Sequence, residues 1–150
     1  MKTLSAFGKI HVNRAAKRVV VDLSPDFVPY YIWHFKKTHW LNLHSPMHCG
    51  HITLANSKLH PKADYQQAAD IFHGQVVSFD YDPNIIRGGR TKGFEMFYMK
   101  VFSRELDRIK RKIKVIDNAG YRGLHVTLGN LNKSGQTPMQ YWPEMIEIKK

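Results

Sequence analysis

The chain has 150 residues, 43% of them hydrophobic and 12% aromatic, which excludes a disordered chain and predicts one globular domain spanning residues 1–150. Lys and Arg number 23 against 12 Asp and Glu, and the resulting net charge of +11 favours partners that carry phosphate. The single cysteine, Cys49, excludes a disulfide framework and a cysteine-rich zinc site.

The beginning of the chain predicts a cytoplasmic protein. Residues 1–7 lack the long apolar run of a signal peptide, and Lys9, His11 and Arg14 follow directly. No stretch approaches the apolar length of a transmembrane helix. We therefore expect a protein that works in the cytoplasm, away from membranes and without an obligate protein partner.

The first fifty residues predict a hairpin, a helix and a loop. Residues 6–12 and 18–23 alternate like two strands joined by a polar turn. Ser24 and Pro25 then predict a helix start, with helical spacing of aromatic residues through residue 37. The aromatic side chains of this helix, Tyr30 and Trp33 among them, are expected either to pack in the core or to stack on bases.

Clustered histidines follow in the loop over residues 42–48. His44, His48 and His51 would suit a zinc ion with one position left for water. The spacing matches no known metal motif, and no carboxylate lies between the histidines. We therefore predict no metal and no cofactor, and keep zinc as an alternative that chelation would reveal.

The middle of the chain predicts helices and strands in alternation. Residues 61–73 read as a helix, and residues 75–81 and 93–102 as strands that pair with each other. Ser103 is placed to cap the next helix, whose buried side would carry Leu106, Ile109 and Ile113.

A basic, glycine-rich segment lies at residues 87–93, between the two predicted strands. Its cations are Arg87, Arg90 and Lys92. Glycine frees backbone amides that, together with cations, suit phosphate binding, although the order of residues is not that of a Walker motif. A plain hairpin connection explains the segment equally well.

The most informative feature is a short pattern that occurs twice. Residues 49–54 read Cys-Gly-His-Ile-Thr-Leu and residues 123–128 read Gly-Leu-His-Val-Thr-Leu. On a strand, His51 and Thr53 would share one face and the apolar residues the other, and the same holds for His125 and Thr127. With nine His in the chain, chance gives about 0.4 His-x-Thr triplets, so two in strand-like settings indicate a paired site.

Two histidines on facing strands suit acid–base chemistry at phosphorus. Imidazole titrates near neutrality, so a neutral ring can accept a proton while a charged one donates it. In-line displacement needs these groups on opposite sides of the phosphorus. The two threonine hydroxyls would donate hydrogen bonds to the nonbridging oxygens.

The doubled His-x-Thr pattern resembles the signature of the 2H phosphoesterase superfamily. The likeness in motif order covers about residues 49–131, and only the two motifs are specific. It implies an α+β, bilobal fold in which two antiparallel sheets form a central cleft with helices outside. It also implies a metal-independent phosphodiesterase, with His51, Thr53, His125 and Thr127 as its catalytic residues.

Among 2H proteins, a short basic chain is most similar to the bacteriophage anti-CBASS nucleases, which cleave 3′-5′ bonds of cyclic di- and trinucleotide messengers of host immunity. The implied setting is the cytoplasm of the infected host cell. The resemblance also suggests residues that bind the substrate: Tyr30, Trp33, Arg87, Arg90, Lys92 and Trp142.

Two alternatives remain open from the sequence. One is a 2H enzyme that acts on RNA ends, as a 2′,3′-cyclic or a 2′-5′ phosphodiesterase. The other is a non-catalytic RNA-binding protein whose histidines are structural and whose binding weakens steeply with salt.

Overall fold

A computed structural model describes residues 2–40, 42–43, 50–91, 94–117 and 123–132, with the backbone alone at 89–91, 94–95 and 131–132. The strands are β1 (Leu4–Asn13), β2 (Arg18–Asp22), β3 (His51–Asn56), β4 (Val76–Tyr81), β5 (Ile86–Thr91), β6 (Phe94–Phe102) and β7 (His125–Asn132). The helices are α1 (Phe27–His39), α2 (Tyr65–Gln67), the π-helical turn η1 (Ala68–Phe72) and α3 (Arg104–Lys112).

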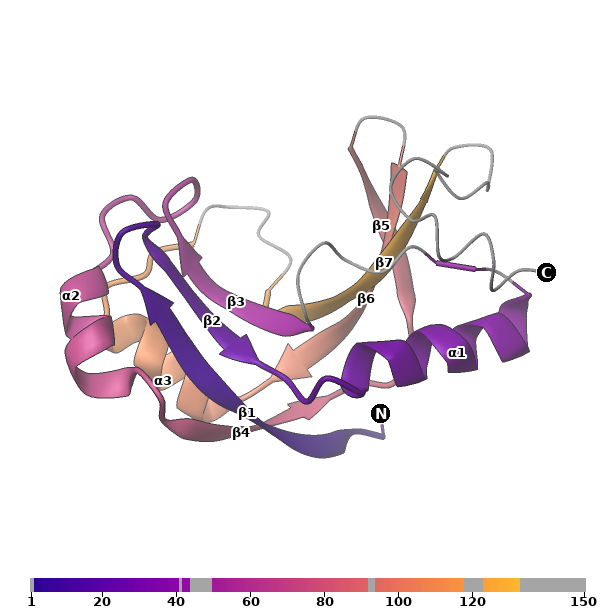
Figure 1. Ribbon diagram of the computed structural model, residues 1–150, viewed down its shortest axis with the longest axis horizontal. Coiled ribbons are helices and arrows are strands. Elements are labelled where there is room, and N and C mark those ends of the chain that lie inside the picture. The colour runs from indigo at the N-terminus through magenta and orange to yellow at the C-terminus, as the bar shows by residue number, and fades with distance from the viewer. Residues whose placement is uncertain (1, 41, 44–49, 92–93, 118–122, 133–150) are drawn as a thin grey trace.

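The strands form a single antiparallel sheet with the order β4-β1-β2-β3-β7-β6-β5. A further pairing, of Asp80 with Phe102 and Tyr81 with Val101, joins β4 to β6 and closes the sheet into a barrel-like ring, with β5 outside it. Figure 1 shows β1, β2 and β3 on one side, β5, β6 and β7 on the other, and β3 meeting β7 between them. The predicted α+β class is confirmed, but the two expected sheets are continuous through β3 and β7.

Alternation along the strands determines which side chains enter the core. Ile52, Leu54, Val126 and Leu128 are each 0% exposed, so the side chains between them in the sequence face the opposite side of the sheet. The same core receives Phe97 and Met99 of β6, Val19 and Val21 of β2, and Leu106, Ile109 and Ile113 of α3.

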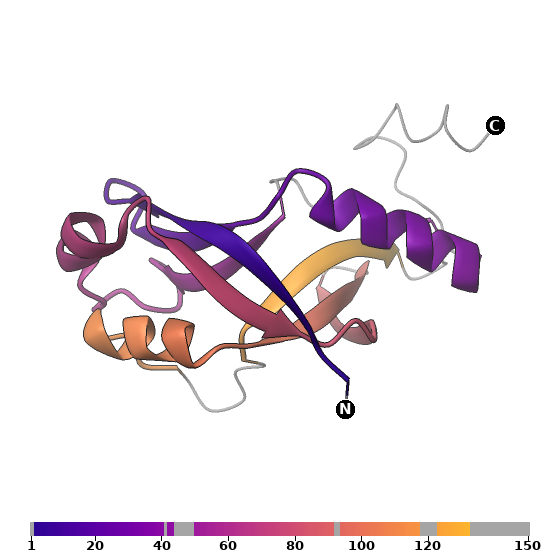
Figure 2. The same cartoon turned by 90° about the horizontal axis from the view of Figure 1, so that it is seen from below.

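Each long helix covers strands that lie far from it in the sequence. α1 packs on β7, and its Phe35 ring lies 5.2 Å from that of Phe97. The Tyr31 hydroxyl shares a 2.6 Å hydrogen bond with Tyr81 of β4. α3 packs on β3 and β4 (Figures 1 and 2). α1 therefore connects β4 with β6 and β7, and α3 connects β3 with β4.

Several local predictions are confirmed. The hairpin is β1–β2, whose Ile10 pairs with Val21. Ser103 caps α3, because its Oγ accepts a 3.1 Å hydrogen bond from the Leu106 amide. α1, however, starts at Phe27 with Asp26 as N-cap, and Ser24 forms the preceding turn instead.

Two predicted segments differ from the structure. In place of a helix over 61–73, the chain turns and forms only α2 and η1, because Asp64 Oδ1 accepts from the Gln67 amide and starts the helix there. Most of the basic segment 87–93 is strand β5, paired with β6 across an irregularity between Gly88 and Arg90. The expected partner of β6, β4, contacts it only at the end of the strand.

Candidate active site on strands β3 and β7

The two His-x-Thr motifs lie side by side in the sheet. Ile52 of β3 pairs with Val126 of β7 in an antiparallel register. One residue to either side, this register sets His51 beside Thr127 and Thr53 beside His125. All four side chains are partly exposed on the face opposite the core. The structure therefore brings together the four residues predicted to be catalytic.

The two motif strands also share irregularities that the sequence prediction did not include. Beside β2, Val20 pairs with Thr53 and Val19 with Ala55, which leaves Leu54 as an extra residue. Beside β6, Tyr98 pairs with Thr127 and Phe97 with Gly129, which leaves Leu128 as an extra residue. Each motif thus carries a β-bulge at its final leucine, and a bulge bends the strand and increases its twist.

The likeness of the two strands extends beyond the motifs. After the bulge, each strand has a small residue and then an asparagine, Asn56 in β3 and Asn130 in β7. Asn56 pairs with Arg18 of β2, and Asn130 pairs with Met96 of β6. The pairs β2–β3 and β6–β7 are therefore related by an approximate twofold axis through Ile52 and Val126.

This register sets how far apart the two histidines lie on the backbone. His51 and His125 are offset by two positions across the ladder, and the Cα atoms of such diagonal neighbours lie about 7–8 Å apart. Both imidazoles extend from the same face of the sheet, so they can approach a phosphoryl group placed between them and donate or accept hydrogen bonds of about 2.8 Å. The pair can therefore engage a single phosphate from two sides.

A backbone carbonyl orients the ring of His125. Its Nδ1 donates a 2.8 Å hydrogen bond to the carbonyl oxygen of Gly123. Gly123 has a φ of +83°, a conformation that favours glycine. Because Nδ1 carries the proton of this bond, Nε2 is the nitrogen that gains or loses a proton when the ring changes charge.

An arginine contacts the ring of His51. Nη2 of Arg18 lies 3.4 Å from Nε2 of His51. A guanidinium has donors only, so a hydrogen bond between the two groups requires Nε2 of His51 to accept and to carry no proton. Arg18 comes from β2, where it precedes the buried valines.

The flanking strands add different neighbours to the two motifs. On β2, Asp22 pairs with His51, whereas on β6 Lys100 pairs with His125. The ring of Tyr98 also packs edge-on against His125, with 5.4 Å between centroids. The alternation of β6 would have revealed Tyr98 and Lys100, because they alternate with the apolar Phe97, Met99 and Val101.

A partly buried ionic cluster of His60, Lys110 and Asp117, here called the His60 cluster, supports the end of β3. His60 is 6% exposed; its Nδ1 accepts from the Asn56 amide at 3.4 Å and its Nε2 donates to Asp117 at 2.9 Å. Lys110 donates to the other Asp117 oxygen at 2.7 Å. Burial alone would raise the pKa of Asp117, but the hydrogen bonds from Lys110 and His60 hold this pKa below its ordinary value.

The predicted aromatic contacts lie elsewhere. Tyr30 and Trp33 are each 54% exposed on α1. Their described ring contacts are with α1 itself: Tyr30 stacks on His34, and Lys37 lies 5.9 Å from the Trp33 ring. None of these described contacts joins Tyr30 or Trp33 to the motif residues.

The predicted basic contacts are only partly described. Arg87 lies over the ring of Phe97, 5.9 Å from its centroid, and Phe97 faces the core. Arg87 therefore belongs to the face opposite the motif histidines. The side chain of Arg90 and all of Lys92 and Trp142 lie outside the described residues.

The zinc alternative involves residues that the structure does not describe, since His44 and His48 fall outside the described ranges. Among the described residues, no three His, Cys, Asp or Glu side chains gather as metal ligands.

The described helices are too short or too polar to cross a bilayer. Comparisons with protein-family models, with curated proteins and with solved structures found no match to this chain.

Proposed function

We propose that this protein is a metal-independent phosphodiesterase of the 2H type, a hydrolase that cleaves phosphodiester bonds next to a ribose hydroxyl. The observation that carries the proposal is the reciprocal pairing of the motifs, His51 beside Thr127 and Thr53 beside His125. Two proton-transfer groups and two hydroxyl donors then converge on one phosphate. The twofold relation of the strands supports treating the two sides of the sheet as two lobes.

The reaction uses the four side chains in complementary roles. One neutral imidazole accepts the proton of the attacking ribose 2′-hydroxyl or water as the new oxygen–phosphorus bond forms. The other, protonated, imidazole gives its proton to the leaving oxygen as the old bond breaks. Thr53 and Thr127 donate hydrogen bonds to the nonbridging oxygens, where negative charge accumulates.

The neighbours of the two histidines support a division of these roles. A hydrogen bond from Arg18 to Nε2 of His51 requires that nitrogen to be unprotonated, as a general base must be. The Gly123 carbonyl accepts from His125 Nδ1, which leaves Nε2 as the nitrogen that would carry the proton to be donated. Asp22 beside His51 and Lys100 beside His125 act in the opposite direction, so our assignment of His51 as the base and His125 as the acid rests on the Arg18 contact.

The proposed substrates are cyclic oligonucleotide messengers, whose 3′-5′ bonds the enzyme would open. The net charge of +11 supports a polyanionic substrate, and the choice of cyclic di- and trinucleotides follows the resemblance to the phage anti-CBASS nucleases. In an infected cell, this activity would remove the messenger that triggers host defence.

A substrate panel tests the proposal. Purified protein is incubated with 3′,3′-cyclic GMP-AMP, cyclic triadenylate, 2′-5′ oligoadenylate and an RNA ending in a 2′,3′-cyclic phosphate, and the products are resolved by HPLC. We expect the two cyclic oligonucleotides to be linearised, at a rate that EDTA leaves unchanged.

The other outcomes are equally informative. Cleavage of the RNA end or of 2′-5′ oligoadenylate alone would retain the 2H reaction and change the substrate. Activity that EDTA removes and zinc restores would favour the His44/His48 site. Salt-sensitive RNA binding with no product from any substrate would indicate the non-catalytic alternative.

A further inference from the structure

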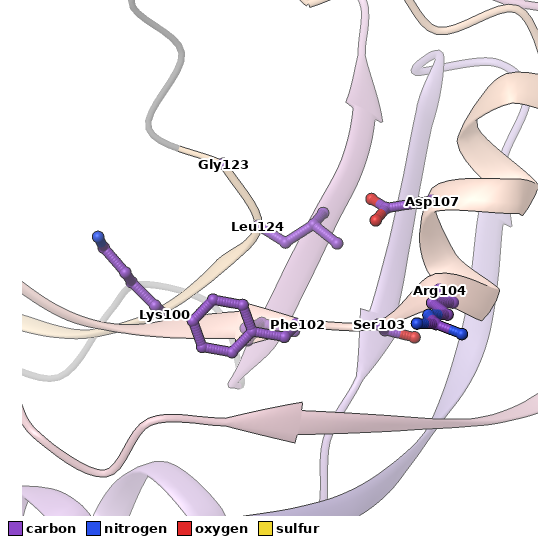
Figure 3. A pocket seen from close by; sticks show the side chains of 8 residues that line it. Lys100, Phe102, Ser103, Arg104, Asp107, Gly123 and Leu124 are labelled. Carbon is purple, nitrogen blue, oxygen red and sulfur yellow. The ribbon is translucent and has the colours of Figure 1, made fainter. Parts of the chain in front are cut away.

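A pocket of about 430 Å³ lies at the foot of the β7 motif, where β6 leads into α3 (Figure 3). Lys100 and Phe102 project from β6, Gly123 and Leu124 lie above them, and Arg104 and Asp107 come from the first turns of α3. Pockets for small ligands typically measure about 300–1,000 Å³, so a mononucleotide can be accommodated.

Two residues that line the pocket are also direct neighbours of His125. Lys100 lines the pocket and also pairs with His125 across the β6–β7 ladder. Gly123 lines the pocket, and its carbonyl accepts the hydrogen bond from His125. A ligand in the pocket would therefore lie next to the atoms that serve His125.

The twofold relation of the strands makes Gly50 and Leu124, the residues before the two motif histidines, equivalent positions. Their surroundings differ. The Leu23 amide donates to Gly50 at 3.0 Å on one side, and the Val101 amide donates to Leu124 at 3.0 Å on the other. At the first position Val28 of α1 packs so closely that a Cβ on Gly50 would lie 2.6 Å from it. The second position instead borders the pocket.

The side chains of the pocket match the parts of a nucleotide. Lys100 and Arg104 supply positive charge for a phosphate, and Phe102, 40% exposed, offers a ring face for a base. Asp107 can accept a hydrogen bond from a ribose hydroxyl or an amino group. Arg104 is the first residue of α3, where the helix dipole disfavours a cation, so helix stability does not account for it.

We propose that this pocket is a subsite for one nucleotide unit, the nucleoside monophosphate that adjoins the scissile phosphate on the side of His125. This assignment rests on the proposed phosphodiesterase function, although its test does not require turnover. Arg104 binds the phosphate of that unit and Phe102 stacks on its base.

Titration calorimetry of the full chain with adenosine 3′-monophosphate, and separately with inorganic phosphate, tests the subsite. Arg104→Gln should weaken adenosine 3′-monophosphate binding by roughly 10-fold or more, because it removes charge-assisted hydrogen bonds. Arg108→Gln, an exposed change on the same helix outside the pocket, should leave binding unchanged. Phe102→Ser should weaken the nucleotide by roughly fivefold or more but not phosphate.

Equal affinities in the two arginine variants, whether both lowered or both retained, would overturn the subsite, as would a wild-type protein that binds no nucleotide at millimolar concentration. An enzyme that cleaves its substrate yet binds the nucleotide independently of Arg104 would keep the proposed function and lose the subsite. A protein that cleaves no substrate in the panel, yet binds the nucleotide in a way that depends on Arg104, would keep the subsite and lose the proposed function. Should Phe102→Ser fail to fold, the arginine pair still decides.

Discussion

Strands β3 and β7 share one pattern of motif and β-bulge but have different neighbouring side chains. Both carry His-x-Thr, both bulge at the following leucine, and both end the pattern in asparagine. Yet His51 has Arg18 and Asp22 as neighbours on β2, whereas His125 has Tyr98 and Lys100 on β6.

This difference shows how a symmetric backbone can serve an asymmetric reaction. Phosphodiester cleavage needs one group to take a proton and another to give one. The backbone duplicates the position of the imidazoles, and the flanking strands make their surroundings unequal. Substitutions in or beside each motif measure how much the two motifs differ in their contribution to activity and stability.

The largest effect is expected from removing either imidazole. His51→Ala and His125→Ala should each lower kcat/KM by about 10²–10⁴-fold, because general acid and base catalysis contributes that much. The double variant should be little slower than either single one, since the two act as a unit. Turnover of the best panel substrate is the measurement, with thermal unfolding to verify folding.

His34→Ala, an exposed change on α1, is the matched control and should keep the wild-type rate. A folded His51 or His125 variant with an unchanged rate would exclude that histidine from the mechanism.

A smaller effect is expected from the threonines. Thr53→Val and Thr127→Val should each lower kcat by about 10²–10³-fold at most, the loss that follows removal of one charge-stabilising donor. Because Thr53 lies beside His125 across the ladder, a double-mutant cycle should couple these two more strongly than Thr53 and His51. Stronger coupling within a motif than across the strands would contradict the reciprocal arrangement.

Local patterns predicted most of the elements that position the site. Alternating residues marked β3, β7 and the β1–β2 hairpin, and a serine followed by acidic residues marked α3. Each of these signals lies within about ten residues of sequence, where propensity and periodicity act directly.

What the sequence could not reveal depends on contacts between distant segments. Glycines and cations suggested a loop at 87–93, but the ladder with β6 makes β5 a strand, since strand formation depends on the pairing partner. The reach of Arg18 to His51 joins side chains on neighbouring strands, so it follows only once the register is known. Tyr98 and Lys100, in contrast, were readable from alternation.

The next smaller effect is expected on the pH dependence of kcat/KM, from the arginine beside His51. Arg18→Gln removes a positive charge that opposes protonation of the ring, so the acidic limb of the kcat/KM profile should move to higher pH. Asp22→Asn removes a negative charge that favours protonation, and should move the limb the other way. Rates measured across pH 5–9 give both shifts.

Arg14→Gln, at the exposed hairpin turn, controls for loss of charge alone and should leave the limb in place. If Arg18→Gln and Arg14→Gln give the same profile, Arg18 does not act on His51, and the assignment of that histidine as the base loses its support.

The smallest expected effect is on stability. It also distinguishes the two strands, because the His60 cluster contacts the end of β3 and not the end of β7 among the described residues. Asp117→Asn should lower the free energy of unfolding by about 1–2 kcal/mol at pH 7. This is near the low end for charged hydrogen bonds, because the Asp117 side chain is 30% exposed.

The pKa of Asp117 is lowered in the folded state, so the carboxylate stabilises the fold above the unfolded carboxyl pKa of about 3.9. This stabilisation is lost as the pH falls through the folded value. Urea unfolding should therefore separate wild type from variant at pH 7 and bring them together in strong acid, whereas Asp70→Asn, an exposed change, should match wild type throughout. If the variant has the same loss of unfolding free energy at both pH values, packing rather than the carboxylate charge stabilises this end of β3.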